Sequence, residues 1–457
     1  MKRPTERDGV ATDMSTIPGD IDTDSQPPMA VPLRHFVVGF GFLVVAAVLR
    51  VAIAVDAMGV ADPAPGLAPL AHVHLLLVGW VCLTIAGAMT QFVPVWSGVA
   101  LHSRRLAVVQ LWLLALGVTG LVAAMLAGRL ALLPVAGAVL ALGFWTFAYN
   151  VGRTLLAARP LDVTERHFLL AIGYFVLVTV LGIVLALDFT RALLGVETVP
   201  RAQMVGAHAT LAVFGAVLTT VFGALYQLTT MFTQTELDRL DRALATFETV
   251  VFPVGVLALA AGRLTANTSV ARAGGLLVVA SVATVGVVLA RRLHAARVPR
   301  TPMLSRYAVA AVGMAGWAVA TLPRWLRSPL AFDARFGASL ESLALFVVGF
   351  VVLGTLYHVV PFVVWVHRYA DRLGYEPVPM IDDLYEDRIA TVDLVATAAG
   401  AACLVAADWP LAPAWLDLAG SGLFLLGVLL CSANLLQVVR VHGDGVVPTL
   451  VGTTPGD

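Results

Sequence analysis

Apolar residues fill the chain in long runs that are separated by short polar segments. A helix that crosses a bilayer needs roughly 20 mostly apolar residues, and the chain offers twelve such runs. The predicted spans are residues 33–55, 72–95, 106–127, 129–157, 167–187, 203–230, 244–263, 272–291, 305–322, 338–366, 391–408 and 413–439. The pattern therefore predicts an all-α, polytopic integral membrane bundle of about 12 transmembrane helices.

The composition agrees with this class of protein. Of the 457 residues, 59% are hydrophobic and 13% are charged, and the mean hydropathy is +0.88, which is typical of polytopic membrane proteins. Residues 1–30 are polar and lack an apolar core, so we expect a disordered cytoplasmic tail rather than a signal peptide. A twelve-span membrane domain at 31–442 and a flexible C-terminal tail at 443–457 follow. The lipid bilayer is the expected partner, and zero net charge gives no reason to expect nucleic acid.

Arginine residues gather in alternate connections between the predicted spans. They lie at Arg34, Arg104 and Arg105, Arg153 to Arg166, Arg239 and Arg242, Arg291 to Arg306, Arg368 to Arg388, and Arg440. The positive-inside rule assigns these connections to the cytoplasm. The predicted protein is therefore a multi-pass protein of the cell (plasma) membrane with both termini in the cytoplasm.

Three spans share a short sequence pattern, which suggests an internal repeat of four helices. Near the inner ends of spans two, six and ten, the sequence reads "GAMTQFVP" from Gly87, "GALYQLTT" from Gly223 and "GTLYHVVP" from Gly354. Aligning the glycines places Gln91, Gln227 and His358 at one level, beside Thr90, Tyr226 and Tyr357. This polar layer has two interpretations: a quinol, proton-entry or metal site, or hydrogen bonds that fix the helices. We favour the second.

Two histidines, His72 and His74, stand at the start of the second span. Two residues along an α-helix correspond to about 200° of rotation, so their rings point to opposite sides and can serve two pockets. In the repeat register His208 of the sixth span is level with His72, and Glu341 is level with His74. The three rings are expected at similar depth, and polar groups inside a membrane are candidate functional sites. Glu341 either accepts a hydrogen bond from a ligand imidazole and orients it, or binds a metal directly, or pairs with Arg335 or Arg327.

The segments "HVHLLLVGW", "GAMTQFVPVW" and "GAHATLAVFGAVLTTVFGALYQL" carry a family resemblance. The chain resembles the catalytic subunit I of the heme-copper oxidases, in particular the C-type enzymes, and equally the NnrS family of heme- and copper-containing membrane proteins. The resemblance implies a pseudo-threefold bundle that binds heme, and possibly copper, through His72, His74 and His208. Glu341 and His358 are further candidate metal ligands. The implied activity is electron transfer, or the handling of nitric oxide or dioxygen, with a small electron-carrier subunit or a quinol as partner.

The chain departs from the oxidases at two spans. Their seventh span carries a histidine pair of the copper site, and their tenth span carries two heme ligands. Here the seventh span, "ATFETVVFPVGVLALAAGRL", and the outer half of the tenth, "ASLESLALFVVGF", contain no histidine. An incomplete copper site favours an NnrS-like or NO-reductase-like role over a proton-pumping oxidase and leaves catalysis open. The alternative function is a proton-coupled secondary transporter without heme.

Overall fold

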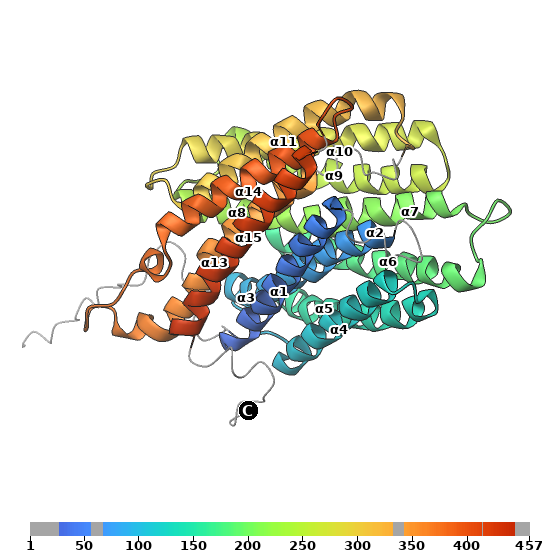
Figure 1. Ribbon diagram of the computed structural model, residues 1–457. Helices are drawn as coiled ribbons and strands as arrows, with labels where there is room; N and C mark the ends of the chain where they lie inside the picture. Colours follow the sequence, from blue (N-terminus) through green and yellow to red (C-terminus); the bar gives the residue numbers. More distant parts are fainter. Residues whose placement is uncertain (1–26, 56–66, 332–341, 414, 444–457) are drawn as a thin grey trace, which may run out of the picture.

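The computed structural model describes residues 27–55, 67–331, 342–413 and 415–443 (Figure 1). Within these ranges the chain forms helices and no β-strand. Twelve continuous helical segments are long and apolar enough to cross a membrane. The predicted all-α fold with twelve spans is confirmed.

The helices carry the labels of Figure 1, and η marks a 3₁₀- or π-helical segment. Their bounds are α1 (Ala30–Ala54), α2 (Leu67–His74), η2 (Leu75–Cys82), α3 (Leu83–Ser97), α4 (Arg104–Leu126), η3 (Leu130–Leu132), α5 (Leu133–Ala157), α6 (Val163–Arg191), α7 (Arg201–Thr210), η4 (Leu211–Leu218), α8 (Thr219–Thr233), α9 (Arg239–Leu264), α10 (Thr268–His294), α11 (Pro302–Arg327), η5 (Leu343–Gly349), α13 (Phe350–Tyr369), η6 (Ala370–Arg372), η7 (Ile381–Leu384), α14 (Asp387–Ala407) and α15 (Trp415–His442). Spans two, six and ten are each composed of a π-helical segment joined to α-helix.

These three composite spans form the inside of the bundle. In the most apolar stretch of each, 67%, 83% and 78% of the residues are buried, against 33–56% in the other nine spans. The chain therefore consists of three units of four spans: unit 1 (30–157), unit 2 (163–294) and unit 3 (302–442). The last helix of each unit packs against the first helix of another, since α5 contacts α6, α10 contacts α11, and α15 contacts α1. The units thus repeat in contacts as well as in sequence.

Each inner span contains a π-helical segment at the same place in its unit. The segments η2, η4 and η5 begin 11 or 12 residues before the glycines Gly87, Gly223 and Gly354 that were aligned in the sequence. A π-helix is rare and is found mostly as a single turn inside an α-helix, frequently at a functional site. Three longer segments in one register therefore support the internal repeat.

The repeated glycines mark a close approach between the first and second spans of each unit. A Cβ atom on Gly87 would lie 2.5 Å from Cβ of His35, and one on Gly223 would lie 2.5 Å from Cβ of His167. On Gly354 the corresponding distance, to Cβ of Arg306, is 3.1 Å. Small residues let membrane helices approach this closely, which explains why glycine recurs in the pattern.

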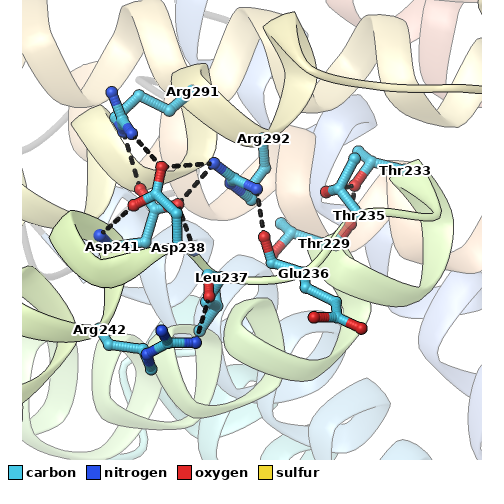
Figure 2. A network of polar contacts seen from close by, with 10 residues as sticks. All are labelled: Thr229, Thr233, Thr235, Glu236, Leu237, Asp238, Asp241, Arg242, Arg291 and Arg292. Carbon is cyan, nitrogen blue, oxygen red and sulfur yellow. Dashed lines mark hydrogen bonds and ion pairs between the residues drawn. The ribbon is translucent and has the colours of Figure 1, made fainter.

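One network of charges joins the start of α9 to the end of α10 (Figure 2). Asp238 caps α9 by accepting a hydrogen bond from the main-chain N–H of Asp241 at 2.9 Å. Arg291 donates through Nε to Asp241 at 2.8 Å, and Nη2 of Arg292 lies 2.5 Å from the same carboxylate. The main-chain oxygen of Glu236 accepts a hydrogen bond from Arg292. The Glu236 carboxylate points away from both arginines in Figure 2. The network fixes the connection between spans six and seven.

Asp238 gives this network a defined pH dependence. The N–H of Asp241 and the nearby Arg291 guanidinium hold the pKa of Asp238 below its ordinary value of 3.8. A lowered pKa in the folded state stabilises the fold above the unfolded pKa, and this contribution is lost as the pH falls through the folded value. Asp238→Ala is therefore expected to lower the thermal midpoint at neutral pH, with the difference from wild type shrinking below pH 3.8. Glu236→Ala is the control, and an Asp238→Ala difference that does not change with pH contradicts the assignment.

Candidate histidine cavity

His74 and His208 line one cavity between five spans. The cavity has a volume of about 210 Å³, and its walls come from α2, η2, α4, α5, α6, α7 and η4. The lining is largely apolar, with side chains such as Leu140, Phe144 and Phe175. We call it the histidine cavity. It brings together the second and sixth spans, as the sequence predicted for two of the three candidate rings.

Main-chain carbonyl groups hold both rings in place. Nδ1 of His74 lies 2.8 Å from the oxygen of Leu70, and Nδ1 of His208 lies 3.2 Å from the oxygen of Val178. A carbonyl can only accept, so Nδ1 carries the proton in each ring. No protein group in the described ranges bonds to Nε2 of either ring. An imidazole held through Nδ1–H in this way has Nε2 available to bind a metal.

His72 is not part of the lining of this cavity. Its ring interacts electrostatically with Arg50, which in turn forms an ion pair with Asp417 of α15 (Nη1 to Oδ2, 3.2 Å). His72 thus lies toward α1 and α15, while His74 lies toward α6 and α7. This placement agrees with the expectation that the rings of His72 and His74 point to different sides of the second span. Arg50 pairs with another span and does not extend freely toward the membrane surface.

His358 is not part of the lining of the histidine cavity either. The ring of His358 packs against Phe232 at 4.3 Å and Phe362 at 5.6 Å between centroids. Glu341 falls outside the described residues. Among the residues that are described, no three His, Cys, Asp or Glu side chains are close enough to hold one metal ion. The structure therefore does not gather His72, His74, His208 and His358 into one metal site.

The polar layer bonds to neighbouring spans. Tyr226 donates to Glu248 of span seven at 2.8 Å, and Tyr357 donates to Asp393 of span eleven. The amide of Gln91 is buried and has no partner within the described residues. The interpretation as helix-fixing hydrogen bonds holds for the two tyrosines and fails for Gln91. The sequence interpretation overlooked both carboxylates, although each is an acidic side chain within a predicted apolar span.

The histidines and apolar walls of the cavity suit a heme, whereas the volume of the cavity is small for one. Histidine is a common axial ligand of heme iron, and the apolar walls suit a porphyrin ring. At about 210 Å³ the cavity is smaller than the roughly 300–1,000 Å³ of typical small-molecule sites. A whole porphyrin therefore requires apolar side chains on the walls to move apart.

Comparison with known proteins leaves the family open. The chain matches no protein-family model, and a search of curated proteins finds no match. The likeness to oxidase subunit I is therefore carried by the sequence motifs alone. Heme binding is accordingly a proposal, argued from the geometry of the cavity.

Proposed function

We propose that this protein binds heme in the histidine cavity and takes part in electron transfer or in the handling of nitric oxide or dioxygen. The observation that supports this most directly is the pair His74 and His208. Each is held by a main-chain carbonyl through Nδ1, and each lines the same apolar space with Nε2 unbonded by any described residue. Both belong to inner spans, whose helical packing provides the rigid support that an axial ligand needs.

The surrounding residues have separate tasks in this proposal. His74 and His208 would hold the iron, and the apolar walls would exclude water from the ring. Arg201 also lines the cavity, where it pairs with Asp188 at 2.5 Å and lies over the ring of Phe189 at 4.1 Å. Its guanidinium is suited to meet the carboxylates of the ligand. Bound heme would supply one-electron chemistry or diatomic-gas binding. Copper is left out, because no three His, Cys, Asp or Glu side chains come together around one point in the described part of the chain.

Visible absorption spectra of four variants test heme binding. Wild-type protein, purified from heme-supplemented cells, is expected to show a Soret band and a positive pyridine hemochrome assay. His74→Ala and His208→Ala are each expected to lose most of the bound heme, because each removes a ligand. His72→Ala and His358→Ala are the matched controls and are expected to keep it. A colourless wild-type preparation that also fails to bind added hemin contradicts the proposal.

The orientation in the plasma membrane is inferred from the arginine distribution. The connections rich in arginine and the two termini belong to the same side, which the positive-inside rule assigns to the cytoplasm. A C-terminal tag is therefore expected to react with antibody only after the cells are permeabilised. Antibody labelling of intact cells would show that the C-terminus is outside and that the orientation is the reverse of the one assigned here.

Proton-coupled transport without heme is the second candidate. Transporters are often built from repeats whose helices are interrupted at matching depths. The segments η2 and η4 interrupt the α-helix in units 1 and 2, and η5 occupies the same register in unit 3, which is the observation that favours this class. The same spectra separate the two candidates, since a transporter of this class has no Soret band.

A further inference from the structure

Three equivalent polar clusters lie between the first and third spans of the three units. In unit 1, His35 of α1 meets Gln110 of α4, with 3.4 Å between the two Nε2 atoms. In unit 2, Nε2 of His167 on α6 lies 3.2 Å from Oε2 of Glu248 on α9. In unit 3, Arg306 of α11 forms an ion pair with Asp393 of α14. The clusters are equivalent because His35, His167 and Arg306 each contact the repeated glycine of their own unit.

The unit 2 cluster, formed by His167, Glu248 and Tyr226, requires a shared proton. Nδ1 of His167 donates to the main-chain oxygen of Val163 at 2.7 Å, so a neutral ring has no proton on Nε2. A carboxylate has no proton either, and two acceptors do not bond at 3.2 Å. The contact therefore holds one proton, either as imidazolium with carboxylate or as neutral imidazole with carboxylic acid. Both forms have zero net charge, so the proton can pass between Nε2 and Oε2 without changing the charge of the cluster.

The other two clusters lack this property. In unit 1, Nδ1 of His35 donates to Val31, and the amide of Gln110 donates to Nε2, so both groups are neutral and neither shares a proton. In unit 3 the partner of Asp393 is a guanidinium, which has only N–H donors and no acceptor atom, so the contact is a fixed ion pair. Only the unit 2 cluster combines a titratable base with a titratable acid.

The charged groups on the elements around the unit 2 cluster form hydrogen bonds or ion pairs with one another, and Tyr226 bonds to the cluster itself. At the start of α6, Asp162 and Glu165 cap the helix through a reciprocal pair of hydrogen bonds. On α9, Asp241 is held by Arg291 and Arg292 of α10. On α8, Tyr226 donates to Glu248 and stabilises its charged form. The side chains of His167 and Glu248 are 3% and 0% exposed, so an uncompensated charge there would be costly.

We propose that the cluster of His167, Glu248 and Tyr226 is a proton-exchange site within the membrane domain. Acid pH adds one proton to the imidazolium–carboxylate pair and gives imidazolium with carboxylic acid. Because the net charge of that form is buried and costly, the proton is returned to water at the nearby ends of α6 and α9. His167 is the fifth residue of α6 and Glu248 the tenth of α9, which places the site one to three helical turns from that end of the bundle. This site is separate from the histidine cavity, and its role does not depend on heme.

Glu248→Gln is the decisive variant because the protein already contains a histidine–glutamine pair at the equivalent place in unit 1. Glutamine at 248 facing His167 reproduces the arrangement of Gln110 and His35 in unit 1, so the helices are expected to keep their packing. Infrared difference spectra between acid and alkaline pH, recorded on protein in lipid nanodiscs, detect the C=O stretch of a buried carboxylic acid. Wild type is expected to show a pH-dependent band that shifts in D₂O, and Glu248→Gln is expected to lose it. His35→Gln, which changes the unit 1 cluster and leaves Glu248 in place, is expected to retain it.

The reverse substitution in unit 1 provides a second test in case Glu248→Gln does not fold. Gln110→Glu places a carboxyl group beside His35 and is expected to add a second pH-dependent carboxyl band to the wild-type spectrum. Loss of the band in Glu248→Gln, or its gain in Gln110→Glu, supports the proposal. A wild-type spectrum without a pH-dependent carboxyl band, or one whose band persists in folded Glu248→Gln, overturns it. Both outcomes are independent of the Soret band that tests heme binding.

Discussion

Replacing Arg306 with methionine is expected to destabilise the fold by about 3–5 kcal/mol, the usual cost of leaving one member of a buried ion pair alone. Arg306 and Asp393 are both 0% exposed, and the pair joins spans nine and eleven. Arg306 also donates to the main-chain oxygen of Ala390 at 2.9 Å, and its guanidinium lies over the ring of Tyr357. Removing it leaves the charge of Asp393 with the Tyr357 hydroxyl as its one side-chain donor among the residues that the structure describes. Thermal unfolding in detergent, followed by fluorescence, is expected to show a much lower midpoint or no folded protein.

Neutralising the partner separates the charge effect from the loss of packing. In the double variant Arg306→Met with Asp393→Asn, the amide can still accept from Tyr357, and no buried charge remains. The double variant is therefore expected to recover part of the lost stability. A surface comparison is Arg291→Met, since Arg291 is 36% exposed and its loss is expected to cost less. A double variant as unstable as the single one would mean that packing, and not charge, dominates at this position.

The number and location of the spans could be predicted because burial in lipid leaves a strong signal in the sequence. The sixth span, predicted at 203–230, is observed at Arg201–Thr233, and the fourth, predicted at 129–157, is observed at Leu130–Ala157. The second span was predicted to begin at His72 but begins at Leu67. Five residues that include Pro69 precede the continuous apolar run, and proline is tolerated in the first turn of a helix.

The side-chain partners could not be predicted in the same way. A π-helical segment changes the hydrogen-bond spacing from four to five residues, so an α-helical register cannot be carried through it. The faces of the inner spans beyond η2 and η4 therefore stayed unassigned, and the link from Tyr226 to Glu248 was not expected. The repeat itself was visible, because the glycine pattern depends on contacts between neighbouring spans and survives a change of helix type.

The glycine pattern provides the second prediction with a large expected effect. Gly223→Ala places a Cβ atom 2.5 Å from Cβ of His167, where neither helix can move without shifting its neighbours. Excess volume in a packed interior typically costs about 1–3 kcal/mol, which exceeds the gain of about 1 kcal/mol that alanine brings to a helix over glycine. The thermal midpoint is therefore expected to fall for Gly223→Ala, and also for Gly87→Ala, whose Cβ would lie 2.5 Å from Cβ of His35.

Two exposed glycines on the partner helices provide matched controls. A Cβ atom on Gly41 of α1 or on Gly173 of α6 meets no atom within 4 Å, so alanine there is expected to leave the midpoint unchanged or to raise it. Because the clash at Gly223 involves His167, the same substitution should also alter the infrared band of Glu248, whereas Gly87→Ala should not. Equal midpoints for Gly223→Ala and Gly173→Ala would show that the two helices can separate freely. The close approach would then not be what holds His167 against Glu248.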